Sequence, residues 1–298
     1  MKLFGSINKK AIFISPEFVL WGEIRTGKSK PELISCDFKA LPEGLVNPHF
    51  GKENISDKKI LREIIEEVLP TGKRKGNIAL TLPDSVARIT VLDFDQLPSK
   101  KEEVEKLISW RIKKTIPIAP EDVKLVYAVL SADENGAEVI TSIASRGVIR
   151  EYEDLLRGIG LRPVLVDIAT LNSMNVFAGM LQDLSLFVNL TERNVGMALR
   201  SKGIVRFFRS KEIDVKKGKV VKEVLSTLTY IKSTFPSIGV DSIFIHSVLK
   251  EAEQITEELK KDFAGSVVRL NMTDFVTIGG EKRDESVLSP LIGGALRL

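Results

Sequence analysis

The stretch LPDSVARITVLDFDQLPSKKEEVEKLISWRIKKTIPI, residues 82–118, predicts a strand and a helix in a fixed order. Residues 86–94 are rich in β-branched side chains and lie between prolines, as strands between turns do. Ser99, followed three residues later by Glu102, predicts a capping box that opens a helix, and this helix should end before Pro117. The order is therefore strand, Leu-Pro turn, amphipathic helix and Ile-Pro stop.

This order of elements resembles the inserted subdomain of the PilM family of type IV pilus assembly proteins, which are actin-like relatives of the cell-division protein FtsA. In that family a Leu-Pro pair, a helix, a Trp, six further residues and a Pro recur, and Trp110 and Pro117 stand in that relation here. The family commonly has an acidic residue after the Trp, whereas this chain has Arg111. The tail, LSPLIGGALRL, is similar to the closing helix of the family, so the resemblance covers nearly the whole chain.

A weak internal repeat agrees with this resemblance. Residues 11–39 predict three strands joined by two turns, and residues 186–209 predict the same meander a second time. Two lobes that each begin with a three-stranded meander are what the actin-like fold consists of. The predicted fold class is thus mixed α/β: an actin-like (ribonuclease H-like) two-lobed fold with an inserted FtsA/PilM-type subdomain.

The elements between the meanders suggest the domain boundaries. A helix capped by Ser56 and stopped by Pro70 should belong to the first lobe. A helix at 148–159 should close the insert, and a helix at 167–180 should return the chain to the first lobe. The second lobe has room only for a short insert at about 211–236, where the family has a longer subdomain. The predicted domains are a first lobe of residues 1–82 and 164–182, an inserted subdomain of 83–163, and a second lobe of 183–298.

The composition is that of a folded protein without redox or metal chemistry. The 298 residues are enough for two lobes, 43% of them are hydrophobic, and the net charge is only +4. No apolar run approaches the roughly 18 to 20 residues that span a bilayer, and residues 1–10 do not resemble a signal peptide, so a cytoplasmic location is expected. Cys36 is the sole cysteine, which excludes an internal disulfide, and His49 and His246 are too few for a zinc site.

The distribution of charge argues against nucleic-acid binding. Basic residues are mostly interleaved with acids, which predicts solvated helix faces, and the basic runs are not interleaved with exposed aromatics. The one local excess, residues 211–222, could contact an acidic membrane surface, but a solvated loop is the favoured interpretation.

The resemblance implies an ATP cleft with three loops, and the first of them is degenerate here. In the family the first hairpin has the pattern acid-Ile-Gly-small-Ser, with a Lys after two more residues. This chain has Ser15, Pro16 and Glu17 in that turn and Leu20 at the Lys position. Pro16 also lacks a backbone N–H that could reach a phosphate.

The other two loops depart from the family pattern as well. Asn189 and Thr191 stand where the second hairpin of the family has Asp and Gly, and His246 and Ser247 replace a Gly-Gly pair in the third loop. The acid, the lysine and the glycines are thus lost together, which predicts a pseudo-ATPase without a cofactor or metal. In a purely structural interpretation Ser15, Glu17, Asn189 and Glu192 are turn formers, and His246 hydrogen bonds to a neighbour at a strand end.

The resemblance also implies a partner, the short N-terminal cytoplasmic segment of a PilN-like membrane protein, held in a groove between the first lobe and the insert. Exposed apolar and basic residues near a strand edge are the candidate contacts. These are Val86, Arg88, Trp110, Arg111 and Ile116. Arg111 falls within the predicted apolar arc of its helix, where an unpaired charge would be costly. The structural alternative is that Trp110 is core and that Arg111 snorkels or pairs within the subdomain.

Two hypotheses of different classes result. The first is a non-enzymatic scaffold of a type IV pilus assembly platform, peripheral to the inner face of the inner membrane, which docks the PilN-like protein. Contact with the pilus assembly ATPase and homodimerisation are left open under it. The second is a working actin-like ATPase that binds ATP and Mg²⁺ through noncanonical loops. A third hypothesis, a type II secretion platform component of the GspL kind, ranks behind because that protein normally carries a membrane helix and a periplasmic domain.

Overall fold

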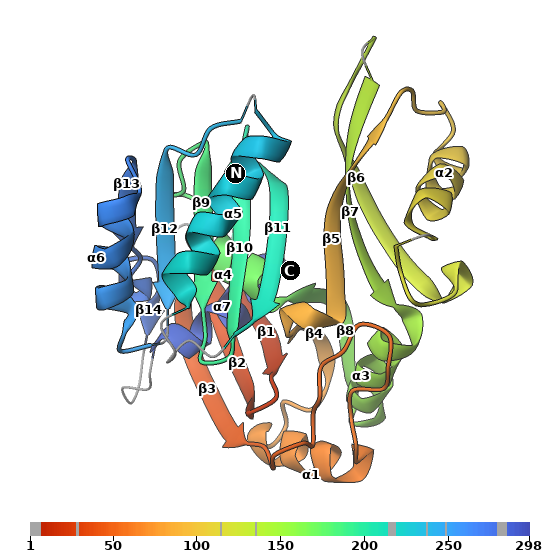
Figure 1. Ribbon diagram of the computed structural model, residues 1–298. Helices are drawn as coiled ribbons and strands as arrows, with labels where there is room; N and C mark the ends of the chain where they lie inside the picture. Colours follow the sequence, from red (N-terminus) through yellow and green to blue (C-terminus); the bar gives the residue numbers. More distant parts are fainter. Residues whose placement is uncertain are drawn as a thin grey trace, which may run out of the picture.

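The computed structural model describes residues 7–27, 30–113, 115–134, 136–213, 219–236, 238–247, 249–278 and 285–298. It has two lobes, each built around one sheet, and a smaller three-stranded sheet that projects beside the second lobe (Figure 1). Within the described residues, no helix is both long enough and apolar enough to cross a bilayer.

The first lobe contains a six-stranded sheet. Three strands form an antiparallel meander, and three more join the sheet by parallel pairing. The order across the sheet is β14-β3-β2-β1-β4-β8. The strands are β1 (Ile7–Ile14), β2 (Phe18–Thr26), β3 (Glu32–Ala40), β4 (Gly76–Leu82), β8 (Leu161–Ile168) and β14 (Thr277–Ile278).

The second lobe repeats this plan. Its sheet has the order β11-β10-β9-β12-β13, which corresponds strand for strand to β3-β2-β1-β4-β8 in the first lobe. In both lobes the three meander strands lie in reverse order and are followed by the fourth and fifth strands of the lobe. The strands are β9 (Ser185–Leu190), β10 (Asn194–Ser201), β11 (Ile204–Glu212), β12 (Ser242–Ser247) and β13 (Ser266–Arg269). The duplication inferred from the two meanders is therefore confirmed.

Helices cover both faces of these sheets, and alternate residues of β1 point into two different cores. Ile12 and Ile14 pack in the core of the first lobe, whereas Ala11 and Phe13 pack in a core that also contains Phe187 of the second lobe. The second core is thus shared by the lobes and holds them together. The helices are α1 (Lys58–Val68), α3 (Arg146–Gly158), α4 (Ala169–Val176), α5 (Val220–Thr234), α6 (Ala252–Asp262) and α7 (Ser289–Leu296).

The inserted unit is a three-stranded antiparallel sheet with one helix on it. Its strands are β5 (Ala87–Phe94), β6 (Val123–Asp133) and β7 (Gly136–Ser145), in the order β5-β7-β6. The helix α2 (Lys101–Lys113) covers one face, and its buried side chains occur at intervals of four residues: Val104, Ile108 and Ile112. Figure 1 shows α2 on the side of this sheet that faces away from the second lobe.

The structure corrects the predicted boundary of the insert. Residues 161–168 form the strand β8 at the edge of the first-lobe sheet, and the helix expected at 167–180 begins only at Ala169. The helix α3 packs through Tyr152 and Leu156 in the first-lobe core, so the three-stranded unit ends at Ser145 rather than at 163. Pro163 obscured β8, because a proline within a strand is tolerated mainly at a sheet edge.

Two predicted helix caps also differ. Asp57, not Ser56, caps α1, because its Oδ1 accepts hydrogen bonds from the backbone N–H groups of Lys59 (2.9 Å) and Ile60 (3.0 Å). The helix α2 begins at Lys101 instead of directly after Ser99, since the Lys100 carbonyl accepts the first helical hydrogen bond, from Val104 N at 3.1 Å. In the expected second-lobe insert, β11 ends at Glu212 and α5 begins at Val220, while residues 214–218 lie outside the described residues.

The helices α4 and α7 cross so closely that one position must be glycine. A β-carbon on Gly293 would lie 1.6 Å from the carbonyl oxygen of Asn172 in α4. Beside this contact the hydroxyl groups of Ser173 and Ser289 are 2.9 Å apart and share a hydrogen bond. The predicted closing helix is thus the element that locks α4 against the first sheet.

We predict that Gly293→Ala lowers the free energy of unfolding by about 1 to 3 kcal/mol, because a methyl group there must push α4 and α7 apart. Gly179 is the matched control, since a β-carbon on it would meet nothing within 4 Å. Gly179→Ala should change the free energy of unfolding by less than roughly 0.5 kcal/mol. Urea unfolding followed by circular dichroism measures both, and equal effects of the two substitutions would contradict the proposed close packing.

Candidate functional site

The three loops identified in the sequence lie at the carboxyl ends of β1, β9 and β12, which is where open α/β sheets bind their ligands. In the first hairpin the Ser15 hydroxyl oxygen accepts hydrogen bonds from the backbone N–H groups of Glu17 (3.1 Å) and Phe18 (3.0 Å). The Ser15 N–H donates to the Phe18 carbonyl at 2.9 Å, and Pro16 has no N–H. The backbone donors of this turn are therefore already used, and Leu20 is fully buried in apolar core.

The second and third loops are joined to each other through side chains. The Asn189 amide oxygen lies 2.9 Å from His246 Nδ1, so Nδ1 is the donor of this hydrogen bond. Both residues are almost fully buried. The Thr191 hydroxyl oxygen accepts from the backbone N–H of Asn194 at 3.1 Å, and the Ser247 hydroxyl oxygen accepts from the N–H of Leu249 at 3.0 Å.

A buried carboxylate, Asp84, lies next to these loops. Asp84 is 4% exposed and is part of the short helix η1 (Asp84–Val86) after β4. It accepts hydrogen bonds from the Thr170 backbone N–H (2.9 Å), the Thr170 hydroxyl (2.6 Å) and the Asn194 side-chain amide (3.1 Å). Burial raises the pKa of Asp84 above its ordinary value, and the hydrogen bonds from Thr170 and Asn194 act in the opposite direction.

Thr170 connects Asp84 to the second lobe. Its hydroxyl oxygen also accepts a hydrogen bond from the Asn189 side-chain amide at 3.1 Å, so an unbroken chain runs from Asp84 through Thr170 and Asn189 to His246. The lobes are so close here that a β-carbon on Gly196 would lie 1.9 Å from the Thr170 hydroxyl oxygen. The two lobes are thus joined directly by protein side chains at this point.

Sequence reasoning missed Asp84 and Thr170 as members of this site. Asp84 lies in a Pro-Asp-Ser turn at the predicted start of the insert, and Thr170 lies near the start of a helix. The available signal was an acid two residues after the end of a buried strand. Among the described residues, no group of three or more His, Cys, Asp or Glu side chains is arranged to hold a metal ion.

The five candidate partner contacts are not on one surface. Val86 is 1% exposed and packs in the first-lobe core, and Ile116 is 8% exposed and packs under α2. Arg88 is exposed, but its guanidinium lies 4.8 Å from the centre of the Phe50 ring and donates to the Thr115 carbonyl at 3.1 Å. Arg88 thus joins a loop of the first lobe to the insert, across the groove in which a partner was expected.

Trp110 and Arg111 differ from their predicted environments. Trp110 is 59% exposed, so the structural alternative that placed it in the core is wrong. Arg111 is exposed and lies outside the apolar stripe of α2, so the argument from a charge in an apolar arc fails. Both residues lie on the surface of α2, where they are accessible to another protein.

Comparisons with known proteins agree on the fold. No protein-family model and no curated protein matches the sequence. A chain of the PilM–PilN type IV pilus biogenesis complex is 15% identical and matches with a TM-score of 0.76 over 97% of both chains. A Bacteroides thetaiotaomicron protein with an actin-like ATPase fold and unknown function is 13% identical, with a TM-score of 0.53 over 88% of this chain and 90% of that one.

The cytoplasmic domain of EpsL, an inner-membrane component of the type II secretion system of Vibrio cholerae, is also similar. It is 13% identical and matches with a TM-score of 0.52 over 98% of this chain and 96% of that one. The chain therefore has the actin-like fold predicted from its sequence, and its structure is similar to that of PilM.

We predict that Asp84 makes stability fall as pH rises. Because burial raises its pKa above 3.8, the folded protein retains a proton that the unfolded chain releases. The stability contributed by this carboxyl is complete below the unfolded pKa and is lost as pH rises through the folded pKa. In Asp84→Asn this dependence disappears, while the altered hydrogen bonding lowers stability by a constant amount.

The test is urea unfolding from about pH 4 to about pH 7. The free-energy difference between the wild-type protein and Asp84→Asn should shrink as pH rises. Asp154→Asn is the control, because the Asp154 side chain is 71% exposed and its removal should give a curve parallel to that of the wild-type protein. A difference between wild type and Asp84→Asn that is constant or grows with pH would contradict the assigned direction.

Proposed function

We propose that this chain is a non-enzymatic scaffold of a bacterial type IV pilus assembly platform. It lies at the cytoplasmic face of the inner membrane and binds the N-terminal segment of a PilN-like membrane protein. The similarity to PilM over nearly the whole chain supports this assignment. The similarity to cytoplasmic EpsL supports a second candidate of the same class, the platform of a type II secretion system.

The observation that carries the non-enzymatic part of the proposal is the chain of hydrogen bonds from Asp84 to His246. It lies at the strand ends where the resemblance implies that an actin-like ATPase would hold phosphates and a metal ion. A nucleotide would have to replace buried hydrogen bonds that Thr170 makes to both lobes, and each buried donor left without an acceptor costs about 1 to 3 kcal/mol. The first hairpin supplies no compensation, since Ser15 already takes its backbone N–H groups.

The partner surface that we propose is the exposed part of the insert around Trp110, Arg111 and Arg88. An exposed tryptophan beside a basic residue has the composition of an interface anchor, because Trp and Arg are enriched among residues that dominate binding energy. Ile116 packs under α2 and Val86 packs in the first-lobe core, so neither of these buried side chains is a direct contact in this proposal.

We predict that calorimetric titration with ATP and Mg²⁺ gives no binding signal at millimolar nucleotide, because a nucleotide there would have to break the buried hydrogen bonds of Thr170. Titration with a peptide from the N-terminus of the PilN-like membrane protein should give saturable binding. Micromolar ATP binding would contradict the pseudo-ATPase assignment and favour the actin-like ATPase. An absence of peptide binding would contradict the scaffold assignment, whatever the result with ATP.

Trp110→Ala should weaken binding of that peptide by about 2 kcal/mol, or roughly thirtyfold, if Trp110 is an anchor of the interface. Met180→Ala is the matched control, because Met180 is a large apolar side chain that is 42% exposed and lies outside the insert. Circular dichroism should show that both variants remain folded. Unchanged peptide affinity of Trp110→Ala would remove α2 from the proposed surface without affecting the ATP result.

A further inference from the structure

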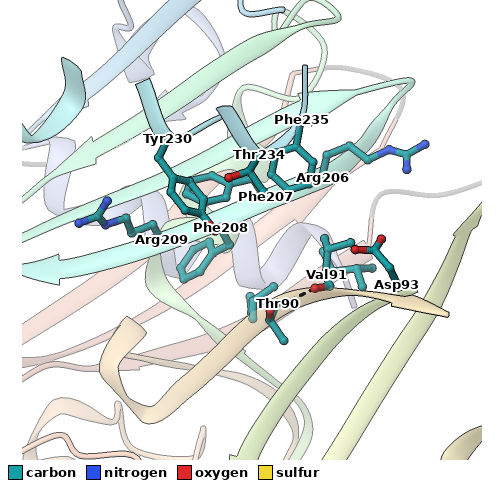
Figure 2. Close-up of a pocket in the computed structure, with 12 residues that line it drawn as sticks. Thr90, Val91, Asp93, Arg206, Phe207, Phe208, Arg209, Tyr230, Thr234 and Phe235 are labelled. Carbon is teal, nitrogen blue, oxygen red and sulfur yellow. Dashed lines mark hydrogen bonds between the residues drawn. The ribbon is translucent and has the colours of Figure 1, made fainter. Parts of the chain in front are cut away.

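A cleft of about 350 Å³ lies between the inserted sheet and the second lobe, on the face of the sheet opposite α2 (Figure 2). One wall comes from β5 and β7 and the other from β11 and the carboxyl-terminal half of α5. The volume is within the range of roughly 300 to 1,000 Å³ that is typical of ligand pockets. None of the proposed contacts on α2 lines it, so what this cleft binds does not depend on the proposed function.

Two free strand edges border this cleft. β5 is the terminal strand of the inserted sheet and β11 is the terminal strand of the second-lobe sheet. They are neighbours, and Figure 1 shows them side by side with no strand between them. Consecutive residues line the cleft, 89–91 from β5 and 206–209 from β11. Side chains of a strand alternate between two faces, so an unbroken run of lining residues means that the backbone edge itself faces the cleft.

The walls around these edges are apolar and aromatic. Ile89, Val91 and Ile140 form the wall on the side of the inserted sheet. On the other side the rings of Phe207 and Tyr230 are in contact, with centroids 5.7 Å apart, and Tyr230 is 48% exposed. Figure 2 shows these rings on the opposite side of the cleft from Val91 and Asp93. A ligand between the walls would bury apolar surface on both sides.

One buried donor in the lining lacks an acceptor. Arg206 is 7% exposed, and its Nη1 pairs with Glu138 Oε2 of β7 at 2.5 Å, which balances its charge. Its buried Nε has no hydrogen-bond partner among the described residues. A buried unsatisfied donor is costly, and because the charge is already balanced, a neutral acceptor such as a peptide carbonyl would satisfy it once the Arg206 side chain rotates to bring Nε to the cleft surface.

We propose that this cleft binds an extended, apolar peptide segment of a partner protein, which adds as a strand to the free edge of β5. Its main chain hydrogen bonds to that edge, one of its carbonyl groups accepts from Arg206 Nε, and its apolar side chains pack against Phe207 and Tyr230. This is strand addition, in which the edge supplies affinity and the pockets beside it supply selectivity.

The test uses the full chain and an acetylated, amidated probe peptide of sequence Thr-Val-Thr-Phe-Thr-Val-Thr with a lysine at each end. Binding is followed by fluorescence anisotropy, and amide hydrogen exchange is measured with and without saturating peptide. Exchange in β5 should slow by about tenfold or more, as expected for new main-chain hydrogen bonds. Exchange in β6, the other edge of the same sheet, should not change and serves as the internal control.

Two matched comparisons separate strand addition from unspecific apolar binding. Two variants of this peptide are N-methylated at alternate residues, one at the residues whose N–H groups would face β5 and the other at the residues between them. The first variant should bind about tenfold more weakly than the unmodified peptide. Arg206→Lys retains a positive charge for Glu138 but removes Nε, and it should also weaken binding about tenfold. Arg269→Lys, an exposed arginine of β13 paired with Glu253, should leave binding unchanged.

Three results would overturn the proposal. The first is unchanged exchange in β5 at millimolar peptide. The second is equal affinity for the unmodified peptide and for both N-methylated peptides, which would mean that the cleft acts only as an apolar surface. The third is protection of β5 that needs no peptide and increases with protein concentration, which would assign the cleft to a second copy of the chain.

Discussion

The Thr170 hydroxyl group donates a hydrogen bond to Asp84 and accepts one from Asn189, and through these two bonds it joins the lobes at the carboxyl ends of their strands. Both bonds are buried, where the low local dielectric strengthens a satisfied network and makes an unpaired member costly. The distance between the lobes at this point is therefore set by side chains of the protein itself. The core shared by Phe13 and Phe187 adds apolar contacts to the same junction.

The local signals in the sequence were sufficient for the duplicated fold. Each meander consists of neighbouring antiparallel strands joined by short turns, so its pattern is complete within one segment. The strand β8 was missed because its partner, β4, is distant in the chain and because Pro163 argues against a strand. The environment of Arg111 was predicted wrongly for a related reason. The apolar stripe of α2 consists only of Val104, Ile108 and Ile112, and the sheet beneath the helix sets that width.

The candidate site shows a different limit. The sequence revealed which family residues are absent, through Pro16, Asn189 and His246, because their neighbours could be matched to a pattern. It did not reveal that Asp84 and Thr170 meet there, because they are 86 positions apart and come together only in the folded protein. A departure from a motif is thus visible locally, whereas the hydrogen bonds made in its place are a property of tertiary structure.

The junction of the lobes also fixes the cleft beside β5. Asn194 donates to Asp84 at 3.1 Å and accepts from the Ser210 hydroxyl at 2.9 Å, so one end of β11 is held beside the segment that leads into β5. Near the other end of β11, Arg206 pairs with Glu138 of the inserted sheet. With both ends attached, the two strand edges keep their separation without a ligand, so the proposed peptide site would need little ordering on binding. Asp84 belongs to both arrangements, because it accepts from Thr170 at the junction of the lobes and from Asn194 beside β11.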